Sequence, residues 1–128
     1  FGGSGSGQIE KSDITPDYLM FHSIDTSRAL AKMSEGWDPY FIDVRSQNEW
    51  IRARISKTVD QFPHDEILSA ISKIPQDRDV LIQCRSGMRS QIAIVQLIKE
   101  GYDASKLYNL ADGILGWAEI NPEGIING

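Results

Sequence analysis

Two short apolar runs, residues 40–44 and 79–83, constrain the fold of this chain more than any other feature. Each run is bounded by polar residues or proline, and is rich in the β-branched, aromatic or aliphatic side chains of a strand buried on both faces. Helical patterns of apolar residues lie between these runs and beyond them. Strands that alternate with helices predict an α/β layer fold around a largely parallel sheet.

The other elements of the alternation are predicted from shorter patterns. Apolar residues at helical spacing, or the capping pair of Ser46 and Glu49, predict helices over residues 23–33, 46–52, 65–74, 91–100 and 114–120. Two more strands are predicted over residues 58–62 and 107–110. The helix at 91–100 is apolar almost all round, which predicts that it is buried, and Gly101 follows it as a stop signal.

A chain of 128 residues with 41% hydrophobic residues is predicted to form one globular domain. Residues 1–11 begin with the sequence FGGSGSG and are expected to be a flexible linker or tag remnant. The domain is assigned to residues 12–121. The last residues, 122–128, contain Pro and Gly and are expected to form a tail without regular structure.

Composition excludes several classes of protein. One cysteine excludes an internal disulfide framework and a zinc site built on paired cysteines, and two isolated histidines argue against a histidine-rich metal site. A net charge of −5 argues against nucleic-acid binding, which needs a basic face. No apolar run approaches the roughly 18 residues of a membrane span. We therefore expect a soluble, cytoplasmic protein that contacts neither nucleic acid nor membrane.

The run at 79–83 brings the single cysteine, Cys84, to the carboxyl edge of the predicted sheet, where open α/β folds bind their ligands. The short loop that follows leaves backbone N–H groups free to form an anion-binding nest ahead of the next helix. Arg85 and Arg89 add positive charge, and Gly87 permits a sharp turn. All these features favour the thiolate, so we expect the pKa of Cys84 to lie below the value of about 8.5 for free cysteine.

Cys84 has three alternative interpretations: a buried structural residue, a phosphatase nucleophile and a carrier of a single sulfur atom. A lone cysteine after an apolar strand is more often a small buried hydrophobe, but two arginines beside one thiol favour a reactive group. Phosphatases with a cysteine nucleophile place five residues between that cysteine and the arginine that grips phosphate. Here four residues separate Cys84 from Arg89, and Ser90 stands at the phosphatase arginine position. The shorter loop favours a single extra sulfur atom on Cys84 over a phosphate.

Three motifs in order resemble the rhodanese family of sulfurtransferases over about residues 15–120. Residues 43–45 and 49–50 (Asp-Val-Arg, then Glu-Trp) are similar to the first family signature, and residues 84–89 to its six-residue active loop. Residues 110–117 are similar to the third signature, although Asp112 replaces the first glycine of its Gly-Gly pair. The resemblance implies a rhodanese-like α/β fold, in which a five-stranded parallel sheet is flanked by helices on both faces.

The same resemblance implies a mechanism. Cys84 is the expected nucleophile and carries sulfane sulfur as a covalent persulfide, without any other cofactor or metal. Thiosulfate or a protein persulfide is the expected donor, and the sulfur passes to a thiophilic acceptor; a cysteine desulfurase and a sulfur-carrier protein are candidate partners. The residues expected to bind substrate and persulfide are those of the loop: Arg85, Ser86, Gly87, Met88 and Arg89.

Supporting roles fall to Asp43 and Arg45. Asp43 is expected to hydrogen-bond the active loop, to cap its own turn or to pair with Arg45, while the four-residue spacing of Arg45 and Glu49 favours a local ion pair. Asp112 is expected to cap the last helix by accepting the N–H of Leu115. Two other functions remain open: a non-catalytic binding module of this fold, and a cysteine-dependent phosphatase or arsenate reductase.

Overall fold

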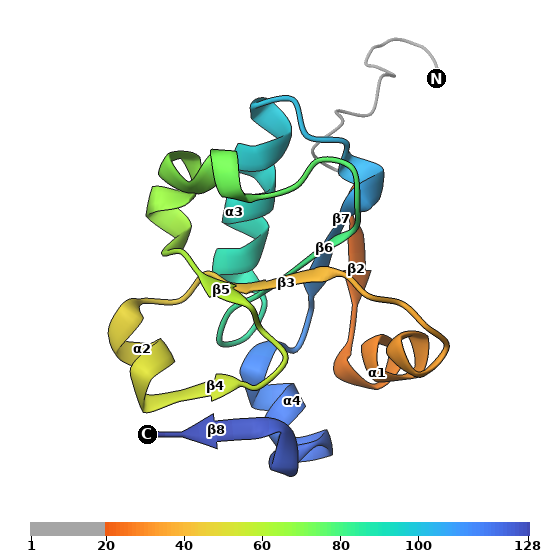
Figure 1. Cartoon of the computed structure of the whole chain (residues 1–128), viewed down its shortest axis with the longest axis vertical. Coiled ribbons are helices and arrows are strands. Elements are labelled where there is room, and N and C mark those ends of the chain that lie inside the picture. Colours follow the sequence, from red (N-terminus) through yellow and green to blue (C-terminus); the bar gives the residue numbers. More distant parts are fainter. Residues whose placement is uncertain (1–19) are drawn as a thin grey trace, which may run out of the picture.

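The computed structural model describes residues 20–128, in which five parallel strands form a central sheet (Figure 1). The strands, in their order across the sheet, are β2 (His22–Ile24), β7 (Leu107–Leu110), β6 (Val80–Gln83), β3 (Tyr40–Asp43) and β5 (Asp60–Gln61). This architecture confirms the predicted five-stranded parallel sheet. The linker predicted over residues 1–11 and the predicted start of the domain at residue 12 lie outside the described residues.

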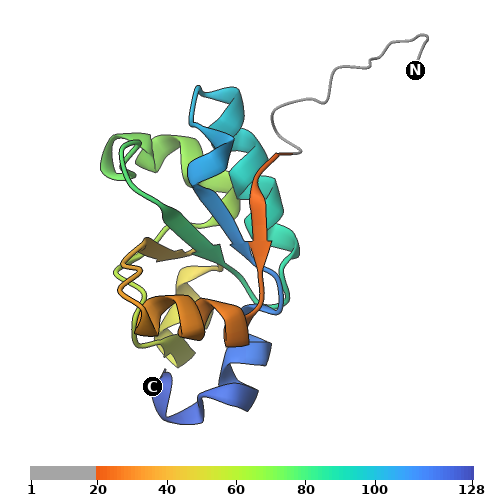
Figure 2. The ribbon, with the colours of Figure 1, turned by 90° about the vertical axis from the view of Figure 1, so that its right-hand side faces the viewer.

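Helices cover both faces of the sheet, as predicted (Figure 2). The 3₁₀ helix η2 (His64–Lys73) and α3 (Met88–Lys99) pack on one face, and α1 (Thr26–Ser34) and α4 (Gly113–Ile120) pack on the other. Because side chains alternate along a strand, β6 supplies both cores: Ile82 packs beneath α3, and Leu81 packs beneath α4. β6 is therefore buried on both faces, which explains its continuous apolar sequence.

The short helix α2 (Gln47–Arg52) follows β3 and begins with the predicted capping box. The Ser46 hydroxyl accepts the backbone N–H of Glu49, and the Glu49 carboxylate accepts the backbone N–H of Ser46. These two bonds satisfy N–H groups that the first turn of a helix leaves free. They also fix the position of the Glu49 side chain at the start of the helix.

The strand predicted over residues 58–62 is shorter, β5 (Asp60–Gln61), and three helices also differ from their predicted form. The helix predicted from residue 23 starts at Thr26, because residues 22–24 form β2 and Asp25 caps α1 by accepting the N–H of Arg28 at 2.9 Å. The helix predicted over 65–74 is a 3₁₀ helix over 64–73 that is kinked at Glu66. The helix predicted from residue 91 starts at residue 88. The prediction missed its first turn because that turn carries no apolar periodicity.

The irregular tail predicted for residues 122–128 is wrong. A 3₁₀ turn, η4 (Pro122–Gly124), leads into β8 (Ile125–Asn127), which pairs antiparallel with β4 (Ala53–Ile55). Pairing gives the backbone of β8 its hydrogen-bond partners, and Ile125 packs against the core on the α4 side. A further 3₁₀ turn, η3 (Ala104–Lys106), precedes β7. Among residues 20–128, no helix is long and apolar enough to span a membrane.

Candidate active site

Cys84 lies at the carboxyl edge of the sheet, between the end of β6 and the start of α3. The loop turns at Gly87, whose φ of 99° is in the left-handed region that favours glycine. The start of α4 fixes the other side of the loop. There the Ile114 N–H donates to the carbonyl of Cys84 at 3.0 Å, and the Leu115 N–H donates to the carbonyl of Arg85 at 3.3 Å. The third motif therefore supports the active loop directly.

The Cys84 sulfur is buried, with 1% of the residue exposed, and hydrogen-bond donors surround it. The Gly87 N–H donates to Sγ at 3.1 Å, and the hydroxyl of Ser90 lies 3.5 Å from Sγ. Burial raises the pKa of the thiol, but hydrogen bonds from the Ser90 hydroxyl and from the N–H groups of Ser90, Gly87 and Ser86 outweigh it and lower this pKa. This arrangement matches the nest of N–H groups expected from the sequence.

The two arginines of the loop have different surroundings. Arg89 binds the carboxylate of Glu49 through two hydrogen bonds of 2.7 and 2.9 Å, and Arg85 is exposed at the rim. The bonds from Arg89 lower the pKa of Glu49 to about 2, so the pair stays charged at any working pH. Hydrogen bonds, rather than arginine side chains, are therefore the main influences that lower the pKa of Cys84.

The predicted Arg45–Glu49 pair is wrong, because Arg45 binds Asp43 instead. The guanidinium Nη2 of Arg45 lies 2.7 Å from Asp43 Oδ2 and also donates to the carbonyl of Ala53 at 2.7 Å. Asp43 is fully buried and accepts the backbone N–H of Arg45 as well. This buried pair ties the end of β3 to β4, and the hydrogen bonds of the Asp43 carboxylate within residues 20–128 all come from Arg45. Asp43 is thus a structural partner of Arg45.

Asp112 does not cap α4 as predicted. Its carboxylate accepts the backbone N–H of Thr26 at 3.1 Å and the Thr26 hydroxyl at 3.0 Å. Asp112 itself has φ −97° and ψ −3°, a helical conformation instead of the extended one typical of a capping residue. The residue that replaces the usual glycine therefore joins α1 to the loop that leads into α4.

A second hydrogen-bond partner of Ser90 was not predicted from the sequence. The Ser90 hydroxyl also donates to Oδ1 of Asn109, a buried residue on β7. Because a hydroxyl has one proton, Ser90 can donate to Asn109 or to the Cys84 sulfur, but not to both at once. While Ser90 donates to Asn109, the thiol form of Cys84 can donate its proton to the Ser90 oxygen. A polar residue inside the predicted strand 107–110 is the only sign of this partner in the sequence.

Replacing Ser90 by alanine is expected to raise the pKa of Cys84, because the thiolate loses a hydroxyl donor. A hydrogen bond to a charged group contributes about 1.5–3 kcal/mol. Thiolate absorbance measured as a function of pH reports the change, and sulfur loading at neutral pH is expected to slow in parallel. Ser69→Ala, at an exposed position on η2, is the matched control. A pKa equal to that of the wild type in Ser90→Ala would contradict this role.

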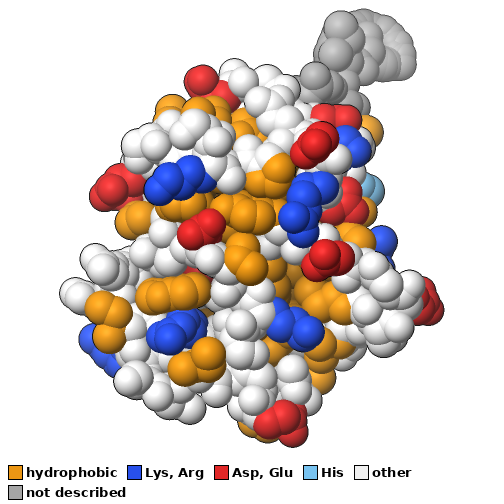
Figure 3. All heavy atoms as spheres, viewed as in Figure 1, with side chains coloured by type: hydrophobic (Ala, Val, Ile, Leu, Met, Phe, Trp, Pro, Cys, Tyr) orange, Lys and Arg blue, Asp and Glu red, His pale blue; other side chains and the backbone are white. Residues whose placement is uncertain are grey.

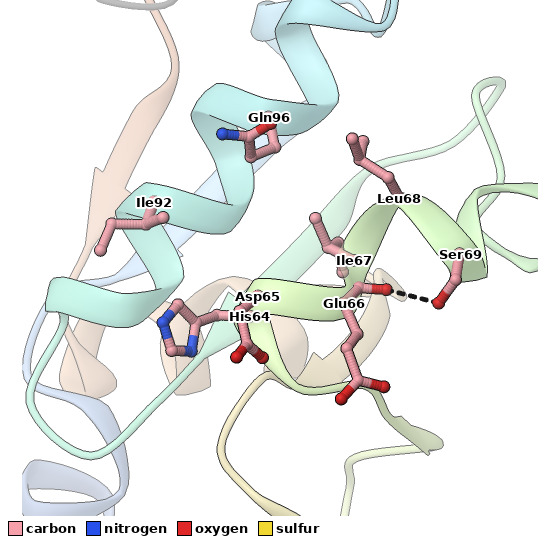
Figure 4. Close-up of a pocket in the computed structure, with 8 residues that line it drawn as sticks. All are labelled: His64, Asp65, Glu66, Ile67, Leu68, Ser69, Ile92 and Gln96. Carbon is pink, nitrogen blue, oxygen red and sulfur yellow. Dashed lines mark hydrogen bonds between the residues drawn. The ribbon is translucent and has the colours of Figure 1, made fainter.

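Two hollows in the described surface differ in their relation to Cys84. The larger one, about 660 Å³, lies between η2 and α3 (Figure 4), and none of its lining residues belongs to the loop 84–89. The other, about 350 Å³, includes Arg85 in its lining and lies between α2, β4, β8 and α4. The smaller hollow is therefore the one that adjoins the candidate active site. We call it the arginine groove.

Comparisons with known proteins show which proteins this chain resembles. The chain is 34% identical over 110 residues to a sulfurtransferase of Allochromatium vinosum, which covers 82% of this chain and all of the relative. It is 31% identical to thiosulfate sulfurtransferase 18 of Arabidopsis thaliana, covering 76% of this chain and 78% of that protein. The crystal structure of reduced Bacillus anthracis CoADR-RHD superimposes with a TM-score of 0.70 at 28% identity, covering 84% of this chain and only 18% of that one.

The family model for the rhodanese-like domain matches residues 26–120, which include all three sequence motifs, the cysteine loop and every strand of the central sheet except β2. This match covers most of the described structure. The chain therefore belongs to the rhodanese-like domain family.

Proposed function

We propose that this protein is a sulfurtransferase in which Cys84 accepts sulfane sulfur from a donor and passes it to a thiophilic acceptor. The observation that carries the proposal is the set of hydrogen-bond donors around Sγ, which lower the pKa of the only thiol in the chain. A thiolate is the nucleophilic form of cysteine. Relatives that are themselves sulfurtransferases support the reaction class, and thiosulfate or a protein persulfide is the proposed donor.

In the first step, the Cys84 thiolate attacks the outer sulfur of thiosulfate. The S–S bond of thiosulfate breaks, sulfite leaves with the electron pair of that bond, and Cys84 becomes a persulfide. The N–H group of Gly87 and the hydroxyl of Ser90 lie where they stabilise negative charge on Sγ before the attack. The persulfide then carries the charge on its outer sulfur.

In the second step, an acceptor such as cyanide or a thiolate attacks the outer sulfur. The S–S bond of the persulfide breaks, and its electron pair returns to Cys84 as the thiolate. The hydrogen bonds that stabilised the starting thiolate now stabilise the leaving group. Since the chain has one cysteine, no internal thiol competes for the sulfur, and an outside acceptor must take it. A cysteine desulfurase as donor and a sulfur-carrier protein as acceptor fit the same two steps.

Two observations favour this reaction over phosphate-ester hydrolysis. Four residues separate Cys84 from Arg89, and both terminal nitrogens of the Arg89 guanidinium donate to the carboxylate of Glu49. A phosphoryl group needs a guanidinium fork on its oxygens. A single sulfur atom needs only the donors already around Sγ. A pure binding module has no use for a cysteine whose pKa is lowered.

Reduced protein is expected to form thiocyanate from thiosulfate and cyanide. The rate is expected to rise with pH as Cys84 ionises, and the midpoint of this rise is expected to lie below the pKa of an ordinary cysteine. A chelator is expected to leave the rate unchanged, because the persulfide is the only carrier in the scheme. Thiocyanate formation is measured with thiosulfate and with a cysteine-desulfurase donor, and p-nitrophenyl phosphate hydrolysis runs alongside. Hydrolysis of the phosphate ester without thiocyanate formation would replace the proposal with the phosphatase alternative.

A further inference from the structure

A chain of hydrogen bonds runs from the Cys84 sulfur to β2, the edge strand of the sheet. The Ser90 hydroxyl lies 3.5 Å from Sγ and donates to Oδ1 of Asn109. The side-chain N–H of Asn109 in turn donates to the exposed hydroxyl of Ser23 at 3.5 Å. Ser90 is fully buried and Asn109 is 1% exposed, so the inner part of this chain is shielded from solvent.

The position of Asn109 follows from the register of the sheet. β7 lies between β2 and β6, and Asn109 pairs with Ser23 on one side and with Ile82 on the other. Paired residues of neighbouring strands project to the same face, so Asn109 shares the face on which Ile82 packs beneath α3. Ser90 lies in the first turn of α3. A polar residue in a mostly apolar strand is therefore placed under the helix that follows the nucleophile.

The Ser90 hydroxyl has one proton and two acceptors, Asn109 Oδ1 and a Cys84 thiolate. A charged sulfur is the stronger acceptor, because hydrogen bonds to charged groups are roughly twice as strong as neutral ones. Donation to the sulfur, however, deprives a buried carbonyl oxygen of its one donor among residues 20–128, which costs free energy. Asn109 therefore opposes ionisation of Cys84, and it regains the hydroxyl when the sulfur is neutral.

No charged side chain among residues 20–128 hydrogen-bonds to Ser90 or Asn109. The elements around the two residues and Cys84 carry these charged or titratable side chains: His22, Asp43, Arg45, Glu49, His64, Asp65, Glu66, Arg85, Arg89 and Asp112. Figure 3 shows acidic and basic side chains interspersed over the described part of one face, so no field of a single sign dominates that face. The group through which Asn109 reaches Cys84 is therefore the Ser90 hydroxyl.

We propose that Asn109 is a positioning residue, which holds the Ser90 hydroxyl while the Cys84 sulfur is uncharged and releases it to the thiolate. When the thiolate attacks the donor, Sγ becomes the neutral inner sulfur of the persulfide, and the hydroxyl turns to Asn109. When the acceptor breaks the persulfide S–S bond, the electron pair returns to Sγ and the hydroxyl turns back. Ser90 keeps its proton throughout. This inference rests on the proposed sulfurtransferase function and adds to it a residue outside the loop.

A variant at Asn109 leaves the surface around the loop unchanged. Asn109 belongs to the α3 face of the sheet, whereas the arginine groove lies between α2, β4, β8 and α4. Asn109 lines neither this groove nor the hollow between η2 and α3. We therefore expect variants at this position to change the ionisation of Cys84 and kcat, with little change in KM for thiosulfate.

Two replacements of Asn109 are expected to move the pKa of Cys84 in opposite directions. Asn109→Ala removes the competing acceptor, so the ionisation constant of Cys84 is expected to rise about tenfold and its pKa to fall. Asn109→Asp keeps the shape and, when ionised, accepts the Ser90 proton more strongly and adds a negative charge, so the pKa is expected to rise. Thiolate absorbance as a function of pH measures both changes. Loss of packing alone would move the pKa in one direction in both variants.

A double variant tests whether Asn109 acts through Ser90. In a Ser90→Ala background, Asn109→Ala is expected to leave the pKa of Cys84 unchanged, because no hydroxyl remains to be shared. Asn48→Ala and Asn48→Asp, at an exposed position on α2, are the matched controls and are expected to titrate like the wild type. Denaturant unfolding shows which variants are folded, and Asn109→Val replaces Asn109→Ala if the smaller side chain unfolds the protein.

The titration needs no turnover, so it separates this inference from the proposed function. An unchanged or raised pKa in folded Asn109→Ala, or an equal change with and without the Ser90 hydroxyl, would overturn the role of Asn109 even if the wild type forms thiocyanate. Opposite pKa changes in a protein that forms no thiocyanate would instead overturn the sulfurtransferase proposal, and the two transfer steps with it.

Discussion

Replacing Cys84 by serine is expected to lower thiocyanate formation by at least about a thousandfold, because no other residue in the chain offers a thiolate. The fold is expected to survive the change. Serine is close to cysteine in size, and its oxygen meets the same Gly87 N–H and Ser90 hydroxyl that surround Sγ. The free energy of unfolding is therefore expected to stay within about 1 kcal/mol of the wild type. Steady-state turnover and denaturant unfolding measure the two effects.

Ser90→Ala is the companion variant for this experiment, because it alters the surroundings of the sulfur and retains the nucleophile. It is expected to keep turnover at high pH, where Cys84 is ionised in either protein. Turnover by Cys84→Ser at a rate comparable to Ser90→Ala would remove Cys84 from the mechanism.

Replacing Gly87 by alanine is expected to impair both stability and sulfur loading. The φ of 99° places an alanine in the left-handed region, which costs about 1–2 kcal/mol. The added Cβ would also meet the backbone of Ala111, with the carbonyl carbon at 3.1 Å and the oxygen closer still. Relief of this clash displaces the Gly87 N–H from Sγ. We expect a loss of more than about 2 kcal/mol of stability and a rise in the pKa of Cys84.

Gly101 provides a matched control for Gly87. Its φ of 102° is nearly the same, but a Cβ at this position meets no atom within 4 Å. Gly101→Ala therefore carries the backbone strain alone and is expected to leave sulfur loading unchanged. Equal loading by Gly87→Ala and Gly101→Ala would show that close packing against Ala111 does not position the loop.

Four of the five strands of the sheet and the position of the nucleophile could be predicted from the sequence because they depend on local patterns, whereas β2 overlaps the helix predicted from residue 23. A strand buried on both faces shows as an uninterrupted apolar run, as residues 79–83 do, and Cys84 follows that run directly. The capping box of α2 is equally local, since Ser46 and Glu49 are three residues apart. In each case the residues that determine the structure are neighbours in the chain.

The rest of the site depends on contacts between distant segments. Glu49 has Arg45 four residues away, yet it binds Arg89, because the fold brings α2 beside the start of α3. Asn109 on β7 reaches Ser90 because the fold packs α3 against β7. β8 was predicted to be irregular because its partner strand, β4, occurs far earlier in the chain. The spacing of neighbouring residues in the sequence does not predict contacts between residues that are distant in the chain.

The central claim is that Cys84 carries one transferable sulfur atom, and the intact mass of the protein tests it most directly. Reduced wild-type protein is treated with thiosulfate, separated from small molecules and weighed before and after addition of cyanide. We expect the wild type to gain one sulfur atom that cyanide removes, and Cys84→Ser to gain none. An unchanged mass in the wild type, or an equal gain in Cys84→Ser, would contradict it.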